Sequence, residues 1–394
     1  MLSGIRIISL CHYLQGPAAA QYLADMGADV IKVEPIGGAY ERRWSGAKVF
    51  VGEVSGFYLC ANKNKRSICI NLKSPEGRAA FLRLVSTADV VMENFRPGTL
   101  DRLGLGYEAL QEAKPDIIFA SASGYGADGP YAELPGQDLL IQARTGLVAA
   151  TAGQAPGILP AAAGCAIVDQ HGAALFALGI GGAIIRKLRT GRGTRVESSL
   201  FNAGIDLQAE AITNYLNGAK TPEVFKRDGH LATWFHEAPY GIYETADGRH
   251  IAMSLNALGL LDEALGPSEL AKDDTLDAYL ERDRVAVDVA ARLARLTLSE
   301  AETALSRHKV WFAPVTNYSE LARDPQAQHN QVFANVTVSG QSAILVNHPN
   351  RYDGAIPGLR HIAERPGQDT VSILTGSGFD AQEIAALLDR GAVA

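Results

Sequence analysis

The chain has 394 residues, more than one hydrophobic core usually serves, so we expect two domains. Hydrophobic residues make up 47% of it and charged residues 20%, the balance of an ordinary soluble globular protein. A formal net charge of -7 argues against a broad nucleic-acid-binding surface, but it leaves room for a local basic pocket that binds a small anion.

Four cysteines (Cys11, Cys60, Cys69 and Cys165) are scattered without a CxxC pair or metal-ligand spacing. This pattern favours reduced thiols and a cytoplasmic location, and we expect no metal. The first residues lack a signal-peptide pattern. The most apolar segment, 173–185, is shorter than the roughly 20 residues that a bilayer span needs, so it predicts a buried helix.

The N-terminal part of the chain alternates between strand and helix patterns. Strands are predicted over 5–10, 28–34, 67–72, 89–93 and 115–121, and helices over 16–26 and 75–86. This alternation predicts an α/β fold with a parallel sheet. Ligands of such sheets bind beyond the carboxyl ends of the strands, which directs attention to segments 14–17, 93–98 and 123–126. None of these carries a dinucleotide-binding fingerprint, so we expect no dinucleotide cofactor.

The second half of the chain does not continue the regular alternation of strands and helices. A hairpin is predicted from 240–243 to 249–253, a helical stretch over 274–307, and a last helix near 381–390. We expect a smaller α+β domain to interrupt the larger one. The expected division is 1–200 for the first part of the large domain, 201–224 for a linker helix, and 225–320 for the small domain. Residues 321–394 are expected to form a linker and the C-terminal part of the large domain.

Asp169 stands between the small-residue stretch 164–168 and the apolar run that reaches Arg186. A carboxylate with so few polar neighbours is expected to be partly desolvated, which suits a covalent nucleophile. An Asp directly before an apolar helix is, however, more often an N-cap. The residues alone leave both interpretations open.

Several short motifs follow one another along nearly the whole chain. They are Gln15-Gly16-Pro17, the stretches 23–34, 62–68 and 93–98, Gly124-Tyr125-Gly126, Gly136-Gln137-Asp138, Thr190-Gly191-Arg192-Gly193, Ala238-Pro239-Tyr240-Gly241 and Ala313-Pro314-Val315. Each is weak by itself. In this order and spacing they resemble the class III CoA-transferases, the CaiB/BaiF-type family, which also contains 2-methylacyl-CoA racemases.

The resemblance implies a homodimer of interlocked chains, each with a large Rossmann-like domain built from both termini and a smaller inserted domain. It implies transfer of CoA between carboxylic acids through a mixed anhydride and an aspartyl-CoA thioester, with acyl-CoA as substrate and no prosthetic group. The nucleophile of the family precedes the apolar helix that leads into Thr190–Gly193, which makes it Asp169 here. Asp138 is the competing candidate, but it lies in the segment that carries the catalytic His of the racemases.

The resemblance also implies contacts to the substrate. Gln15 is assigned to the acyl group or the developing oxyanion. The residues expected to bind CoA are Arg42, Leu72, Lys73, Asn94, Phe95, Arg96 and Tyr125. Arg43 is an alternative to Arg42 for the phosphate contact. Phe95 would pack on the adenine or the pantetheine arm of CoA. Tyr125 is equally well explained as a packed aromatic residue.

Three features bear on the choice of reaction. Gln137 occupies the position of the racemase His and cannot shuttle protons at neutral pH, which argues against α-proton chemistry. His236-Glu237 is the remaining source of a base. His230, Trp234 and His236 lie where some transferases carry a glycine-rich lid, and they are candidates to shape the acceptor pocket.

A second carboxylate on the acceptor would suit the side chains of Arg42, Arg43, His230 and His236. We therefore expect a dicarboxylic or hydroxy-acid acceptor. Migration of CoA between two carboxyl groups of the same acid is a variant of this reaction. A racemase, a hydrolase and a non-catalytic acyl-CoA-binding protein remain the alternatives.

Overall fold

The computed structural model describes residues 1–151, 159–218 and 221–394. The chain divides into two compact units, one made of 1–141, 166–207 and 325–394 and the other of 142–165 and 208–324. These boundaries differ from the expected ones in two ways. Segment 142–165 belongs to the second unit, and the expected linker helix is two helices, α9 (Leu200–Asp206) in the first unit and α10 (Ala209–Asn217) in the second.

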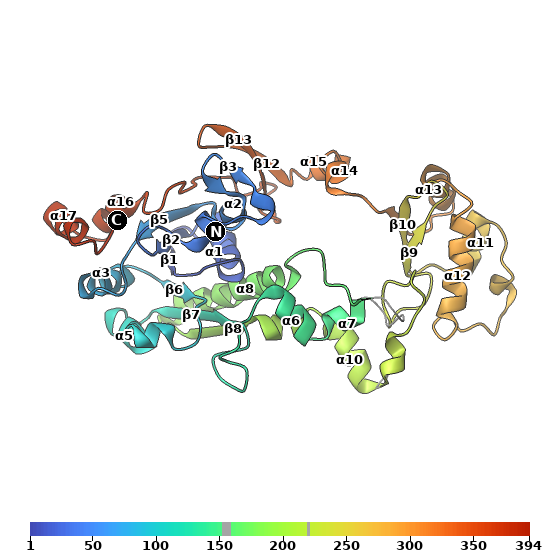
Figure 1. Ribbon diagram of the computed structural model, residues 1–394, viewed down its shortest axis with the longest axis horizontal. Helices are drawn as coiled ribbons and strands as arrows, with labels where there is room; N and C mark the ends of the chain where they lie inside the picture. The colour runs from blue at the N-terminus through green and yellow to red at the C-terminus, as the bar shows by residue number, and fades with distance from the viewer. Residues whose placement is uncertain (152–158, 219–220) are drawn as a thin grey trace. The chain divides into compact units, whose positions relative to one another are not determined.

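The first unit is built around a six-stranded sheet of order β5-β2-β1-β6-β7-β8 (Figure 1). Its strands are β1 (Arg6–Ser9), β2 (Asp29–Glu34), β5 (Lys65–Cys69), β6 (Val90–Glu93), β7 (Ile118–Ser123) and β8 (Arg195–Ser199). Every neighbouring pair is parallel, which confirms the predicted α/β fold. β7 starts later than expected because Ile117 closes a turn onto Lys114, and Pro115 within that turn has no N–H to donate.

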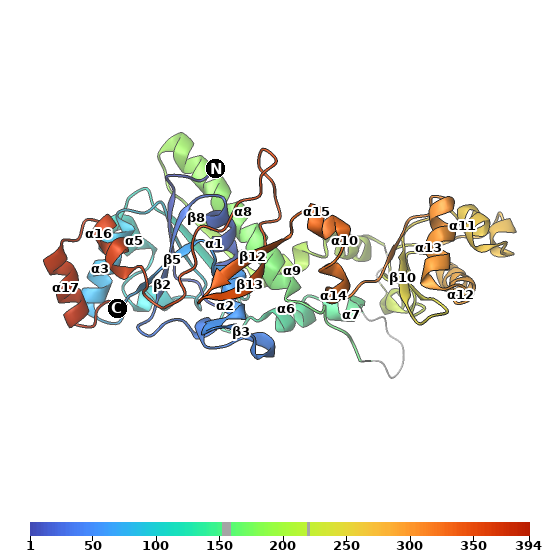
Figure 2. The same cartoon turned by 90° about the horizontal axis from the view of Figure 1, so that it is seen from above.

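Helices cover both faces of this sheet (Figures 1 and 2). α1 (Gln15–Asp25) and α8 (Ile167–Thr190) pack on one face. The other face carries α3 (Pro75–Val85), α5 (Tyr107–Ala113), α16 (Thr370–Gly376) and α17 (Ala381–Asp389). Successive strand residues point to opposite faces, so Ile7 joins the α1–α8 core while Ile8 joins the other.

α8 contains the apolar segment that was expected to be buried. By length and composition this helix could cross a membrane, and 44% of its most apolar stretch is buried inside the protein. Phe176 and Ile180 face the core, whereas Leu178, Ile185 and Leu188 are 71%, 58% and 71% exposed. The prediction of a buried helix is therefore correct for one face of α8 only.

The remaining parts of the first unit are short. They are β3 (Phe50–Val51), β4 (Val54–Ser55), α2 (Gly56–Asn62), α4 (Thr99–Arg102), α6 (Asp138–Arg144, which crosses into the second unit), α15 (Pro325–His329), β12 (Phe333–Val338), β13 (Gln341–Val346) and the 3-10 turns η1 (Tyr40–Arg42) and η2 (Gly46–Lys48). The β12–β13 hairpin packs on α2 through a shared core that includes Tyr58 and Val338. This contact attaches the C-terminal return to the N-terminal part of the unit.

The second unit has its own small sheet and core. Its elements are α7 (Leu147–Thr151), η3 (Pro222–Phe225), β9 (Gly241–Glu244), β10 (His250–Met253), α11 (Leu258–Leu265), η4 (Leu270–Lys272), α12 (Arg282–Leu293), α13 (Leu298–Arg307), β11 (Phe312–Pro314) and α14 (Tyr318–Leu321). β9 and β10 form the expected hairpin, in an antiparallel sheet of order β11-β10-β9. The expected helical stretch 274–307 is interrupted, because Thr297 and Glu300 form a capping box that starts α13 anew.

Candidate active site

The predicted site residues of the first unit follow the carboxyl ends of its parallel strands. Leu72 comes after β5, Gln15 after β1, Asn94 after β6 and Tyr125 after β7. Neighbouring strands lie about 4.8 Å apart, so the step from β5 to β6 spans roughly 14 Å along this edge. An extended ligand such as a nucleotide thioester could contact several of these segments at once.

Asp169 lies in the first turn of α8, which begins at Ile167 with Ala166 as its N-cap and no capping side chain at that position. Its main-chain N–H donates to Oδ1 of Asp138 at 3.0 Å, and the N–H of Val168 donates to the same oxygen at 2.8 Å. The N-cap interpretation of Asp169 is therefore wrong, because Asp138 caps the helix from another segment. The carboxylate of Asp169 is left for another role.

The surroundings of Asp169 favour its neutral form. Burial raises its pKa to about 7, and the nearby charge of Asp138 adds to the shift. The side chain is nevertheless only partly buried, so a substrate can reach it. A carboxylate with little hydration and a pKa near neutrality is a stronger nucleophile than an exposed one.

Gln15 begins α1 and is 3% exposed. Its Nε2 is buried and has no hydrogen-bond partner among the described residues. A Cβ placed on Gly172 would lie 2.9 Å from this nitrogen, so the amide fits closely against α8 only because residue 172 has no side chain. Gly172 follows Asp169 by three positions and shares its face of the helix. A free donor therefore lies about one turn from the carboxylate.

Asn94, Phe95 and Arg96 differ in what they contact. The Asn94 carboxamide accepts from the N–H of His12 at 2.7 Å and donates to its carbonyl at 2.8 Å, which ties β6 to the turn before α1. Phe95 and Arg96 line a cavity of about 600 Å³. Arg96 is exposed, so its guanidinium is available to an anion.

Leu72 and Lys73 lie between β5 and α3. Leu72 packs partly against the core, while Lys73 is exposed. Tyr125 is half-buried, and its ring lies 5.7 Å from that of Tyr131 and 5.8 Å from that of Phe201. These contacts favour the interpretation of Tyr125 as a packed aromatic residue.

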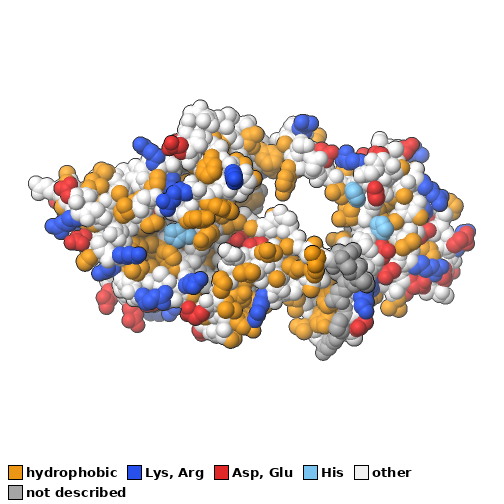
Figure 3. All heavy atoms as spheres, in the orientation of Figure 1, with side chains coloured by type: hydrophobic (Ala, Val, Ile, Leu, Met, Phe, Trp, Pro, Cys, Tyr) orange, Lys and Arg blue, Asp and Glu red, His pale blue; other side chains and the backbone are white. Residues whose placement is uncertain are grey.

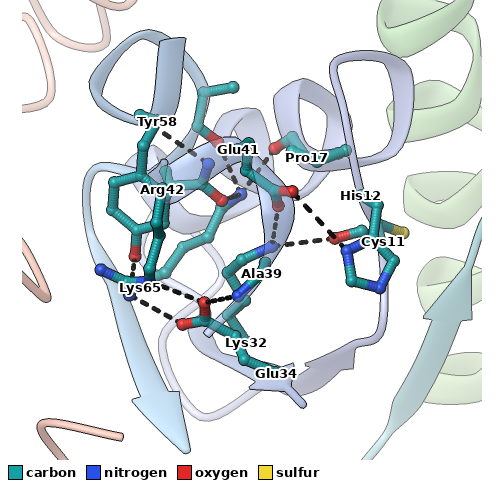
Figure 4. Close-up of polar contacts among 12 residues, drawn as sticks. Cys11, His12, Pro17, Lys32, Glu34, Ala39, Glu41, Arg42, Tyr58 and Lys65 are labelled. Carbon is teal, nitrogen blue, oxygen red and sulfur yellow. Dashed lines mark hydrogen bonds and ion pairs between the residues drawn. The ribbon is translucent and has the colours of Figure 1, made fainter. Parts of the chain in front are cut away.

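The geometry contradicts a phosphate-binding role for Arg42. Its guanidinium is buried, donates to Glu34 through Nε at 2.6 Å and Nη2 at 2.7 Å, and also donates to Tyr58 (Figure 4). A further bond goes from Nη1 to the carbonyl of Ala363. A guanidinium engaged on every side has no donor left for a ligand. Of the two arginines considered, Arg43 is the exposed one.

Lys65, the first residue of β5, is also buried. Its Nζ donates to the carbonyls of Pro17 and Ala61 and to Oδ1 of Asn62 (Figure 4). Burial lowers the pKa of this ammonium well below its usual value. Lys65 therefore holds the start of α1 in place and is not available to a phosphate.

The candidate acceptor residues lie in the second unit. His230 contacts Asp228 at 2.6 Å, and His236 lies 2.8 Å from the Thr233 hydroxyl and 3.9 Å from Glu210. Trp234 is buried among the rings of Tyr215, Phe225 and Phe235, and Glu237 is exposed. Trp234 is thus a core residue of this unit.

Replacing Asp138 by Asn should move the pH profile of the enzyme. The amide oxygen can still accept the two N–H groups of α8, but the negative charge that helps to raise the pKa of Asp169 is gone. We expect the acidic limb of kcat/KM to lie near pH 7 in the wild type and to move to lower pH in the variant, because Asp169 then ionises more readily. An unchanged limb would show that a different group controls it.

Replacing Gly172 by Ala should lower the rate without lowering stability. The new methyl displaces the Gln15 amide, while the change from Gly to Ala favours the helix by up to about 1 kcal/mol. We expect kcat to fall roughly tenfold at unchanged melting temperature, because displaced catalytic groups lose rate steeply. In a Gln15→Ala background the same substitution should have no further effect on kcat. A full additional loss there would show that the methyl group does not act through the Gln15 amide.

The fold and the site define an α/β enzyme with a desolvated carboxylate at the head of a core helix and a free amide donor beside it. Comparison with known proteins is more specific. Residues 2–370 match the model of CoA-transferase family III. The chain therefore belongs to CoA-transferase family III and is a CoA-transferase, as the motifs indicated.

Characterised relatives extend over most of the chain. An "Acyl-CoA transferase" of Fusarium pseudograminearum is 35% identical, with 100% of this chain and 88% of the relative aligned. The succinate–glutarate CoA-transferase of Agrobacterium fabrum is 36% identical over 83% of each chain. Among solved structures, a CaiB/BaiF family protein from Brucella suis has a TM-score of 0.81 and 29% identity, covering 95% of this chain and 99% of its own.

Proposed function

We propose that this CoA-transferase moves CoA from an acyl-CoA thioester to a free carboxylic acid through covalent intermediates on Asp169. The main support is the combination of a partly exposed, desolvated carboxylate with the unpartnered Gln15 amide one helical turn away. Asp138 is the capping and positioning group, since its oxygen is already occupied by two N–H donors of α8.

In the first half of the reaction, an oxygen of Asp169 attacks the acyl carbon of the donor. The carbon–sulfur bond breaks, a mixed anhydride forms, and CoA is released as its thiolate. The thiolate then attacks the Asp169 carbonyl carbon, which yields an aspartyl-CoA thioester and the free donor acid. Each attack builds negative charge on a carbonyl oxygen, which the Gln15 amide is placed to stabilise.

In the second half, the acceptor carboxylate attacks the carbonyl carbon of the aspartyl-CoA thioester, the carbon–sulfur bond breaks, and a second mixed anhydride forms. The released thiolate then attacks the acceptor acyl carbon of this anhydride, and the Asp169 carboxylate leaves. This sequence keeps the energy of the thioester in covalent form throughout, and it regenerates Asp169. For the CoA moiety we assign Leu72, Lys73, Asn94, Phe95 and Arg96, with the cationic side chains toward its phosphates. Arg43 takes the place of Arg42 as the further phosphate candidate.

For the acceptor we propose a dicarboxylic or hydroxy acid. Relatives that share 30% or more of their residues with this chain carry names such as succinyl-CoA:glutarate CoA-transferase (human) and succinyl-CoA:mesaconate CoA-transferase (Haloarcula marismortui). A substrate panel in which unsubstituted monocarboxylic acids are the best acceptors would contradict this assignment.

We further propose that the enzyme is a cytoplasmic homodimer. α8 exposes Leu178, Ile185 and Leu188 along one stripe, and α6 exposes Leu139 and Leu140. Figure 3 shows hydrophobic side chains gathered at the surface around these two helices. An exposed apolar stripe of this kind usually marks a surface that another chain covers.

Charges on this stripe should weaken the dimer. We expect wild-type protein to scatter light as twice 41.9 kDa, and the double change Leu178→Asp with Leu188→Asp to shift the mass toward 41.9 kDa, because the charges would be buried in the interface. Leu388→Asp, at another exposed leucine, is the matched control and should leave the mass unchanged. A wild-type mass near 41.9 kDa would contradict the dimer.

The covalent mechanism can be tested by trapping. The protein is mixed with a pool of acyl-CoAs, quenched with hydroxylamine and digested, and the peptides are analysed by mass spectrometry. A hydroxamate on the peptide that contains Asp169 is the expected result. Exchange of the α-proton of a donor without any hydroxamate would instead support the racemase alternative.

A further inference from the structure

His12 lies in the turn between β1 and α1, among the residues assigned to CoA. Its main-chain N–H and carbonyl are both bonded to the Asn94 carboxamide. Its ring centroid lies 5.3 Å from that of Phe95, and the side chain is 24% exposed. The imidazole is therefore held in place at the edge where we locate CoA, with one side open to a ligand.

A buried ion pair of Lys32 and Glu41 lies beside this imidazole (Figure 4). Oε1 of Glu41 accepts from Nζ of Lys32 at 2.8 Å, and both side chains are 1% exposed. Lys32 also donates to the carbonyl of Cys11, the residue directly before His12, at 2.9 Å. The pair is thus joined to the main chain of the turn as well as to the side chain of His12.

The second oxygen of Glu41 is directed at His12. Oε2 is buried, has no hydrogen-bond partner among the described residues, and lies 3.7 Å from Nδ1 of His12. Burial alone would raise the pKa of Glu41, but Lys32 and His12 together hold this pKa below its usual range. Glu41 is therefore an anion near neutral pH, and Nδ1–H is the donor that it faces, which leaves Nε2 for a ligand.

The turn itself is strained. Tyr13, between His12 and Gln15, has a φ of 60°, a left-handed conformation that is unfavourable for a bulky residue. Such strain persists where the surrounding contacts require it, and it is common at active sites. Here the strained residue lies between His12 and Gln15, whose Nε2 has no hydrogen-bond partner among the described residues.

We propose that His12 contacts the sulfur of CoA through Nε2, with Glu41 and Lys32 as positioning residues. The assignment rests on the proposed function. His12 shares its turn with Gln15, whose amide lies against α8 one turn from Asp169, and the bond that breaks there is the carbon–sulfur bond. The cations suited to phosphates, Lys73 and Arg96, follow other strands.

The chemical role follows from the charge on sulfur. When Asp169 attacks the donor, the electron pair of the broken carbon–sulfur bond stays on sulfur, and Nε2–H of a protonated His12 donates a hydrogen bond to the thiolate. When the thiolate attacks the anhydride, a carbon–sulfur bond forms, the donor acid leaves with the electron pair of its bond to the anhydride carbon, and the proton stays on His12. No proton is consumed. Glu41 supplies the counter-charge of the protonated ring.

The test compares CoA with desulfo-CoA, which lacks the sulfur. By calorimetry we expect wild-type protein to bind CoA at least tenfold more tightly than desulfo-CoA, because a hydrogen bond to a charged group contributes that much. His12→Ala should bind the two ligands equally and lose about 100-fold in kcat. His308→Ala removes another partly exposed His that faces a Glu, at 3.3 Å in the second unit, and should change neither quantity.

Equal weakening of both ligands by His12→Ala would overturn the sulfur contact and move His12 to another part of CoA. Unchanged affinities and kcat would show a purely structural ring. Glu41→Gln keeps an acceptor for Lys32 but removes the charge, so it should reduce the preference for CoA over desulfo-CoA, and a full preference would overturn the positioning role. Failure of the proposed function is distinguishable, because it would show as the absence of a hydroxamate at Asp169 in the wild type.

Discussion

Asp169→Asn should abolish turnover while CoA still binds. An amide in place of the carboxylate cannot attack a thioester, so we expect kcat to fall by roughly 10³-fold or more, with the CoA dissociation constant within a few fold of the wild type. Steady-state kinetics and calorimetry measure the two quantities. Trapping with hydroxylamine should give no hydroxamate on the peptide that contains residue 169. Near-normal activity would remove Asp169 from the mechanism.

The same substitution should raise stability, and the effect should depend on pH. The pKa of Asp169 is raised to about 7 in the folded protein, so the native state holds this proton more tightly than the unfolded chain does. The resulting contribution is fully present below about pH 4 and is lost as the pH rises through about 7. Because the side chain is partly exposed, we expect Asp169→Asn to gain on the order of 1–2 kcal/mol at pH 8 and nothing at pH 4.

Arg42→Ala should have the largest effect on stability. Removing the guanidinium leaves Glu34 buried without its counter-charge and breaks the link to the carbonyl of Ala363 in the C-terminal return. Breaking a buried ion pair by removing one partner costs about 3–5 kcal/mol. We therefore expect the midpoints of urea and thermal unfolding to drop strongly at neutral pH. At that pH Glu34 is ionised, because its partners hold its pKa below the ordinary value although burial alone would raise it.

Arg43→Ala is the matched control, since the side chain next in sequence is exposed. Its stability should stay within about 0.5 kcal/mol of the wild type. If Arg43 contacts a phosphate, its removal should raise KM for the acyl-CoA several fold. The opposite pattern, with normal stability and weakened CoA binding in Arg42→Ala, would restore Arg42 as a ligand of CoA.

The secondary structure of the first unit could be predicted largely from the sequence, because hydrophobic periodicity and turn residues are local signals. The strands that became β1, β2 and β6, the helices α1 and α3, and the β9–β10 hairpin lie within a few residues of their expected bounds. Strands were expected in the C-terminal tail, but the β12–β13 hairpin was not located. On β13, Ile344 and Val346 are 68% and 69% exposed while Ala343 and Leu345 face the core, so the run 343–346 is apolar on both faces and lacks the alternation of a half-buried strand.

The site was predictable only in part. A location at the carboxyl edge of the sheet is expected from the strand and helix alternation, and Asp169 is the candidate nucleophile because of its apolar flanks and the order of the motifs. The role of Arg42 was not predictable, because from the sequence alone an arginine is expected to be a surface cation. Its partners, the Glu34 carboxylate, the Tyr58 hydroxyl and the Ala363 carbonyl, are known only from the structure. The same holds for Lys65, whose Nζ is bonded to the carbonyls of Pro17 and Ala61.

By itself the sequence determined the class of fold and the family, and it indicated the candidate edge of the sheet and the candidate nucleophile, since each of these depends on order and spacing along the chain. Only the tertiary structure decided which carboxylate caps α8, that Gln15 fits against Gly172, and that Glu41 faces His12. Asp138 and Asp169 are 31 positions apart and Gln15 and Gly172 are still farther apart. Contacts over such separations are set by the packing of helices on the sheet, and no local pattern in the chain records them.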